Sequence, residues 1–148
     1  MKPDVDVTLQ LIAASLMTEI APKISDDYIQ RNSMLTGMLL QIAAEEWDRG
    51  AARRVEENRA MRRLFAEAAP KIDDPGLRAR LEAASGEEDE SLRISDLNHS
   101  NDRLRTLLIE LHTHVEEIDT ETARRIEAAI WRELRVSAER RALSLAPF

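Results

Sequence analysis

The sequence of 148 residues contains no cysteine and few aromatic or glycine residues. Without cysteine there can be no disulfide and no thiolate chemistry, and the composition fits a reducing compartment. Only five side chains are Phe, Trp or Tyr, so aliphatic residues and alanine must fill the core. The four glycines are scattered, at positions 37, 50, 76 and 86, and form no phosphate-binding loop.

Basic side chains are also fewer than acidic ones: the sequence has 21 of the first and 28 of the second, which gives a net charge of −7. Such a balance disfavours a general surface for nucleic acid or for anionic membranes. The uncharged run near the N-terminus, Val7 to Thr18, is shorter than the roughly 18–20 apolar residues of a membrane span. Asp4 and Asp6 near the start do not fit a secretory signal. We therefore expect a cytoplasmic protein with no nucleic-acid partner, no membrane partner and no cofactor.

Histidine is scarce as well, and its placement does not favour catalysis. On a helix, His112 and His114 lie on opposite sides of the apolar seam, so both cannot hold one ion. The Glu-x-x-His motif of di-metal carboxylate bundles does not occur. Asp96 and His99 have its spacing but lie away from the seam. We predict no metal ligand and no catalytic residue, and an enzyme is not the favoured class.

Against these absences stands one long helical stretch, Ser25 to Ala69. Ser25 suits an N-cap position, and Asp26 and Asp27 suit the positive end of the helix dipole. The stretch has no proline for about 44 residues, which at 1.5 Å per residue is about 66 Å. It ends where Pro70 forces the preceding residue out of the α region. We predict one continuous helix around which the rest of the chain is organised.

The two halves of this helix differ in pattern. The broad apolar arc of Met34–Ala44 predicts burial against more than one neighbour. Outside its narrow apolar stripe, Glu45–Ala69 is dense in Arg and Glu, which we interpret as a salt-bridged, solvated face, with an acidic or nucleic-acid partner as the alternative. Gly37 and Gly50 indicate close helix packing or a mild kink, and a hinge at Gly50 is the alternative. The narrow apolar stripe of the second half is Trp47, Ala51, Val55, Met61 and Phe65.

Shorter helices are predicted on both sides. Residues 4–20 should form a helix that folds back on the first half of the long one. Asp74 and Pro75 begin a short helix that ends at Gly86. The acidic run 87–90 is interpreted as the solvated start of the next helix, with a cation or basic partner as the alternative. The last helix begins at Asp119–Thr120, and a weakly apolar tail, docked or disordered, follows with Leu143, Leu145 and Phe148.

The most regular pattern is a heptad seam that predicts coiled-coil-like packing. Asn101 is its one polar member, and it either fixes register or lies at an exposed helix end. The seam consists of Ile94, Leu97, Asn101, Leu104, Leu108, Leu111, Val115 and Ile118.

Together these patterns predict an all-α fold in a single domain, residues 1–148. The fold is an up-and-down bundle of four main helices plus one short helix. The long helix overreaches its partners, so the stripe Val55 to Phe65 is expected to lie uncovered. A second copy of the chain covering it would make a symmetric homodimer; the competing explanation is that the short helix folds back over it.

The function that these features favour is a non-enzymatic protein-interaction or scaffold bundle acting through helix faces. A small-ligand- or metal-binding bundle is the first alternative, and a transcription-associated regulator is the second. Glu46 and Asn58 lie near the inner stripe of the long helix. We interpret them as boundary residues or as partners in internal hydrogen bonds, and a ligand pocket between helices is the alternative. The candidate interface or pocket residues are Glu46, Trp47, Val55, Asn58, Phe65, Asn101 and His112.

Overall fold

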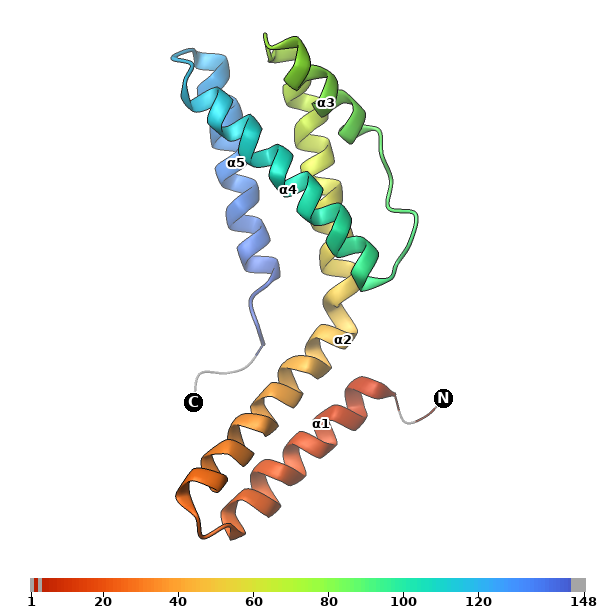
Figure 1. Ribbon diagram of the computed structural model, residues 1–148, viewed down its shortest axis with the longest axis vertical. Helices are drawn as coiled ribbons and strands as arrows, with labels where there is room; N and C mark the ends of the chain where they lie inside the picture. Colours follow the sequence, from red (N-terminus) through yellow and green to blue (C-terminus); the bar gives the residue numbers. More distant parts are fainter. Residues whose placement is uncertain (1, 3, 145–148) are drawn as a thin grey trace. The chain divides into compact units, whose positions relative to one another are not determined.

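The computed structural model describes residues 2 and 4–144, and within them the chain forms helices and connecting segments with no strand. The all-α prediction is confirmed (Figure 1). A π turn and a 3₁₀ turn extend the first helix as far as Lys23. Leu145 and Phe148 of the predicted tail lie outside the described residues. The α-helices are α1 (Val5–Ser15), α2 (Asp27–Ala68), α3 (Pro75–Ser85), α4 (Ile94–Glu116) and α5 (Glu121–Arg140).

The long helix α2 runs for 42 residues without interruption and passes through Gly50, as predicted. Its cap differs from the prediction. The Asp26 carboxylate accepts hydrogen bonds from the backbone N–H groups of Tyr28 and Ile29, at 2.9 and 3.0 Å, so Asp26 and not Ser25 caps the helix. The helix ends in a 3₁₀ turn, Ala69–Lys71, because Pro70 cannot continue it.

The other helix boundaries follow local chemistry. The Asp74 carboxylate accepts from the Leu77 N–H at 2.7 Å, and the Thr120 hydroxyl accepts from the Ala123 N–H at 3.2 Å, so both predicted helix starts are confirmed. The acidic run 87–90 does not start a helix, because α4 begins only at Ile94. Its interpretation as a solvated first turn is therefore wrong.

The described residues form two compact units, each of which includes part of α2. The N-terminal unit contains α1 and α2 up to Gly50, together with Leu143 and Ser144. The C-terminal unit is Ala51–Ala142. We keep a single domain as the prediction, since one uninterrupted helix is an element of both units.

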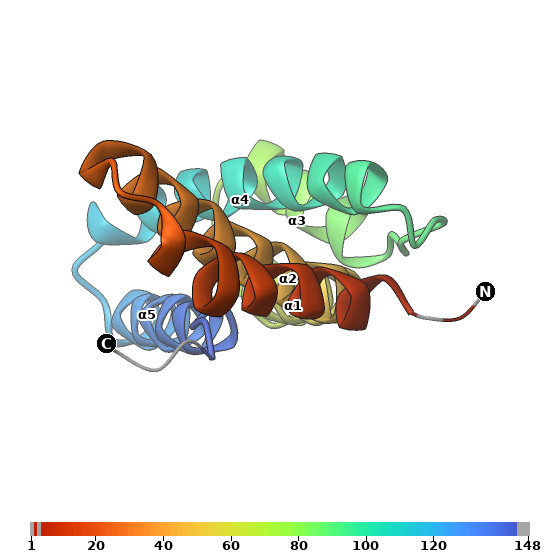
Figure 2. The same cartoon turned by 90° about the horizontal axis from the view of Figure 1, so that it is seen from below.

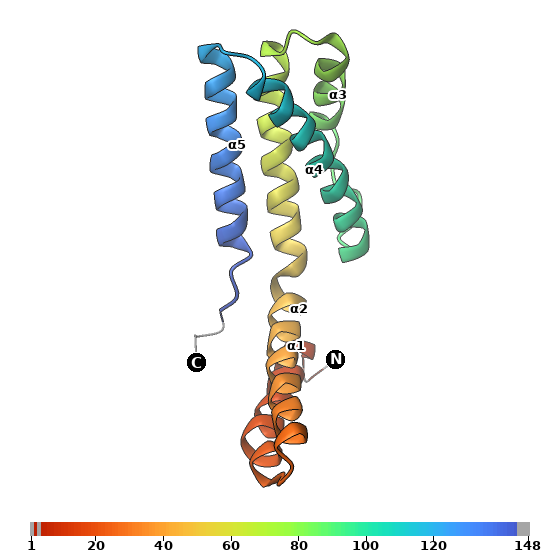
Figure 3. The ribbon, with the colours of Figure 1, turned by 60° about the vertical axis from the view of Figure 1, so that its left-hand side comes forward.

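The C-terminal unit is a bundle of α3, α4, α5 and the second half of α2. Its helices alternate in direction along the chain (Figures 1 and 3), and α3 and α4 lie on one side of α2 with α5 on the other (Figure 2). Met61 and Phe65 are 3% and 0% exposed in a core that includes Leu77 and Leu81 of α3, while Val55 is half-buried. The stripe expected to lie uncovered is thus largely covered by the chain's own helices, as the competing explanation predicted.

Helix α4 buries most of its predicted seam, because apolar residues spaced three and four apart share one helix face. Ile94 is 36% exposed at the helix start, and Ile118 follows the helix end and packs half-buried against the core. The buried members are Leu97, Asn101, Leu104, Leu108, Leu111 and Val115.

In the N-terminal unit, α1 lies beside the first part of α2 (Figure 1), as predicted. A Cβ atom added at Gly37 would lie 2.3 Å from Met17 Cγ and 3.3 Å from the Ala13 carbonyl oxygen. The glycine therefore permits a helix contact too close for any side chain, which confirms close packing at this position. Glu45 and Arg49, one helical turn apart on α2, form a salt bridge at 2.8 Å.

We predict that Gly37→Val destabilises the N-terminal unit by about 1–3 kcal/mol, because overpacking forces the two helices apart. Urea denaturation followed by the fluorescence of Trp47, in a Trp131→Phe background, would measure this. Adding Met17→Ala should recover part of the loss by removing the clashing atoms. Ala52→Val, at an exposed position of α2 in the C-terminal unit, is the control and should cost under about 1 kcal/mol. An equal loss in both valine variants would contradict the packing role of Gly37.

Candidate functional site

The C-terminal unit contains a buried carboxylate. Glu57, in the second half of α2, is 1% exposed. Its Oε1 accepts from the Ser137 hydroxyl at 3.0 Å and from Arg141 Nε at 2.6 Å. Its Oε2 accepts from the second Arg141 nitrogen at 2.5 Å, from Asn101 Nδ2 at 3.2 Å and from Arg105 at 3.4 Å. One carboxylate therefore connects α2 with α4 and with the end of α5.

The hydrogen bonds continue from Asn101 to the segment between α3 and α4. Asn101 Nδ2 also donates to Asn58 Oδ1 at 2.8 Å, and Asn58 Nδ2 donates to Asp89 Oδ1 at 3.1 Å. Arg62 binds both oxygens of Asp89, at 2.9 and 3.0 Å, and donates to the Ser100 hydroxyl at 3.0 Å. We call the whole set the Glu57 network: Glu57, Asn58, Arg62, Asp89, Ser100, Asn101, Arg105, Ser137 and Arg141.

The electrostatics of this network favour ionised carboxylates. Burial acts to raise the pKa of Glu57, but the hydrogen bond and charge of Arg141, with help from Ser137 and Arg105, outweigh it and lower the pKa to about 2. For Asp89, burial again acts to raise the pKa, and Arg62, Ser100 and Asn58 together lower it below its ordinary value. Both groups are therefore charged at neutral pH.

This arrangement suits a carboxylate that holds the helices together better than it suits a catalytic base. A general base works best when its pKa lies near the operating pH, and that of Glu57 lies far below neutrality. Donors already contact both of its oxygens. A buried network whose carboxylates are paired with donors fixes the register of the helices that contribute to it.

The structure brings some of the predicted site residues together and leaves others apart. Asn58 and Asn101 are 0% and 4% exposed and hydrogen-bonded to each other, whereas Phe65 is part of the apolar core. Val55 and Glu46 are half-buried. Trp47, in the N-terminal unit, is 61% exposed, and the His112 side chain, on α4, is 18% exposed.

The central residue of the network was missed. The Arg- and Glu-rich half of α2 was interpreted as a solvated face, yet Arg53, Glu57 and Arg62 are 7%, 1% and 6% exposed, so that interpretation is wrong for these three. The signal that could have found them is the polar residue at an inward position of each neighbouring helix, Asn101 on α4 and Ser137 on α5. Buried polar groups require partners, and those partners had to come from α2.

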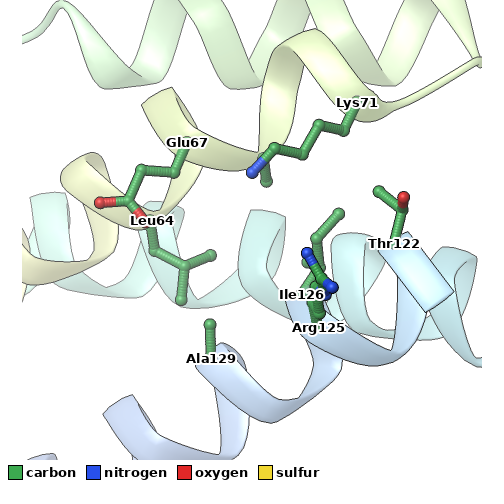
Figure 4. Close-up of a pocket in the computed structure, with 8 residues that line it drawn as sticks. Leu64, Glu67, Lys71, Thr122, Arg125, Ile126 and Ala129 are labelled. Atoms are coloured by element: carbon green, nitrogen blue, oxygen red, sulfur yellow. The ribbon is translucent and has the colours of Figure 1, made fainter.

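A shallow pocket of about 240 Å³ lies between α2 and α5. Figure 4 shows Leu64 facing Ala129, with Lys71 across from Thr122 and Arg125. Arg125 already pairs with the exposed carboxylate of Glu121. The volume is below the roughly 300–1,000 Å³ typical of small-molecule sites, and no residue predicted for a pocket lines it.

A second cluster lies on α4 and α5, where His112, Glu116 and Glu127 place one potential ligand atom each within 4.8 Å of the others. His112 Nε2 is 3.4 Å from Glu116 Oε1. Sequence reasoning compared histidines along a single helix, so it could not pair His112 with a carboxylate of the next helix.

We predict that the stabilising effect of Glu57 depends on pH. A folded pKa of about 2 against an ordinary value of 4.5 gives stability that is present above about pH 4.5 and lost as the pH falls toward 2. The contribution is on the order of 3 kcal/mol at neutral pH. The free energy of unfolding of wild type and Glu57→Gln, measured by urea denaturation between pH 7 and pH 2, should differ most at pH 7 and converge at low pH.

Glu56→Gln is the matched control for this experiment. The Glu56 side chain neighbours Glu57 on α2 but is 61% exposed, with Arg140 3.7 Å away. Exposed pairs contribute about 0–1 kcal/mol, so the control should track wild type at every pH. A stability difference for Glu57→Gln that stayed constant from pH 7 to pH 2 would contradict the ionised network.

Comparison with known proteins gives no function by similarity. The chain matches no family model, no curated protein and no solved structure.

Proposed function

We propose that this chain is a protein-interaction module that forms a homodimer through its N-terminal unit, α1 and the first half of α2 from each copy packing into four helices. The observation that carries the proposal is the amount of apolar surface that this unit leaves in water. Its fully buried apolar residues are three alanines, Ala13, Ala21 and Ala44. Its exposed large apolar residues are Val5, Val7, Leu11, Ile12, Ile20, Tyr28, Ile29, Met34, Leu35, Leu39, Trp47 and Leu143.

Helix α2 is apolar on two opposite faces in this unit. Gly37 faces α1, and Leu35 and Leu39 each lie about 160° round the helix from it, at 100° per residue. These two leucines are 53% and 56% exposed. From Asn32 to Ala44 the helix carries no charged residue. The apolar arc predicted to contact more than one neighbour contacts α1 on one side, which supports a second neighbour on the other.

A second copy is the simplest neighbour because a two-fold interface uses every residue twice. Five aliphatic side chains of this unit are more than half exposed: Leu11, Ile12, Ile29, Leu35 and Leu39. Half-burying one is worth on the order of 1 kcal/mol, so two copies gain on the order of 10 kcal/mol. Association costs roughly 4–15 kcal/mol, and the exposed Tyr28 and Trp47 add the aromatic area that interfaces favour. The gain and the cost are thus of the same size, and the aromatic area adds to the gain, which supports dimerisation.

A lipid surface is the competing occupant. Val5–Lys23 is the one helix of the described chain that could cross a membrane, judged by length and a mean hydropathy of 1.2. Residues 1–50, however, carry eight acidic and four basic side chains, a net charge of −4, which repels anionic headgroups. The charge therefore favours the second copy. Our proposed location is the cytoplasm, which the absence of cysteine fits.

We predict that wild type sediments as a dimer at micromolar concentration and that Leu35→Glu with Leu39→Glu shifts it to monomer. Two buried glutamates per copy would be unpaired in the interface, which costs several kcal/mol. Sedimentation equilibrium measures the mass, and circular dichroism checks that both proteins stay helical. Glutamate is a good helix former, so the double variant should keep its helices.

Leu92→Glu with Ile109→Glu is the matched control. These residues belong to the C-terminal unit and are 72% and 66% exposed, so the same charge is added at positions that are even more exposed than Leu35 and Leu39. This control should remain dimeric. A wild-type monomer at tens of micromolar would refute the proposal, and so would flotation of the wild type with phosphatidylcholine vesicles but not of the leucine variant.

A further inference from the structure

We propose that the His112 cluster on α4 and α5 binds a first-row transition-metal dication such as Zn²⁺. The cluster is His112 and Glu116 of α4 with Glu127 of α5. It lies in the C-terminal unit, so it is independent of the surface proposed for dimerisation.

The geometry of the first two ligands matches a tetrahedral metal site. Zinc lies about 2.0–2.2 Å from imidazole nitrogen and carboxylate oxygen, so two of its ligand atoms are about 3.4 Å apart. His112 Nε2 and Glu116 Oε1 are 3.4 Å apart, one helical turn from each other. Glu127 reaches the same place from the neighbouring helix, with all three ligand atoms within 4.8 Å. A rotation of its flexible side chain would complete a three-ligand set and leave a fourth position for water.

The Nε2 atom of His112 is available to a metal ion. His112 Nε2 is buried and makes no hydrogen bond among the described residues, although Glu116 is close. Buried polar atoms without a partner are uncommon, and a bound cation would satisfy this one.

Trp131 supports the cluster from outside. Its indole Nε1 donates to Glu127 Oε1 at 3.4 Å. Its ring meets the His112 ring edge to face, with the centroids 5.2 Å apart and the planes at 86°. Contacts of this kind orient ligands in metal sites, and here one side chain touches two of the three ligands.

The kind of ligand atoms decides which class of metal ion would bind. One imidazole nitrogen and two carboxylate oxygens suit Zn²⁺ and its neighbours in the first transition row, whereas Mg²⁺ and Ca²⁺ prefer oxygen ligands alone. Two carboxylates also neutralise the charge of a divalent ion. We therefore expect Zn²⁺ and Co²⁺ to bind and Mg²⁺ not to compete.

The competing interpretation is an ordinary ion pair, in which protonated His112 contacts Glu116 and no metal binds. A second histidine provides the internal comparison. His99 is exposed and lines an acidic surface with Asp96 and Glu88, where a metal could collect without a built site. The test must therefore separate the His112 cluster from this surface.

The experiment titrates tag-free full-length Trp47→Phe protein with Zn²⁺ by calorimetry while the fluorescence of Trp131 is followed. We expect one Zn²⁺ per chain with micromolar affinity and a change in Trp131 emission, since the indole contacts two ligands. Co²⁺ should give the strong visible absorption of a tetrahedral site. Glu127→Gln, which keeps the size of the side chain, and His112→Ala should each weaken Zn²⁺ binding at least tenfold, whereas His99→Ala should leave it unchanged.

Some outcomes would overturn the proposal. These are no Zn²⁺ binding below 100 µM, or loss of binding in His99→Ala but not in Glu127→Gln. If His112→Ala unfolds, Glu127→Gln and Glu116→Gln decide the question, because both alter partly or mainly exposed side chains. Unchanged binding in both glutamine variants would leave only the ion pair.

Discussion

A charged carboxylate inside a helical bundle is tolerable only when donors surround it, and this condition governs the C-terminal unit. Taking Glu57 out of water would cost several kcal/mol if it were unpaired. The cost is offset by Asn101 and Arg105 from α4 and by Ser137 and Arg141 from α5. A shift of one helix by one residue would turn these donors away, so the charge selects a single register. The apolar core around it supplies stability but cannot discriminate between registers in this way.

The two units bury the surface of α2 to different extents, although α2 belongs to both. In the C-terminal unit α2 has apolar and polar partners around it, and even its arginines at positions 53 and 62 are buried. In the N-terminal unit α2 contacts α1 through Gly37 and keeps leucines in water on the opposite face. A hairpin of two helices has no interior, because each helix covers only one side of the other. Its remaining apolar surface must be covered from outside the unit or stay exposed at a cost.

Local signals in the sequence predicted the helices well, since caps, prolines and apolar spacing act within a few residues. Asp74 with Pro75, Thr120 and the α4 seam lie where these rules place them. Whether the charged half of α2 is buried or exposed could not be predicted from such local signals. A pattern of Arg and Glu looks identical on a solvated face and in a buried network, because the difference lies in partners such as Asp89 and Arg141 that are distant in sequence. The cluster of His112 and Glu127 was not predicted for the same reason, since its residues lie on different helices.

The Glu57 network also bears on the chemistry possible elsewhere in the C-terminal unit. Helices α4 and α5 run in opposite directions (Figure 3). Asn101 and Arg141 are therefore hydrogen-bonded at one end of the pair, whereas His112 and Glu127 meet nearer the turn that joins the two helices. Between these points the pair is packed through Leu104, Leu108, Leu111 and Ile130. Ligand atoms on separate helices can share an ion only if the helices hold their relative register, since a displacement of about 1 Å exceeds what metal coordination accepts. The buried carboxylate at one end and the apolar core in the middle supply that constraint.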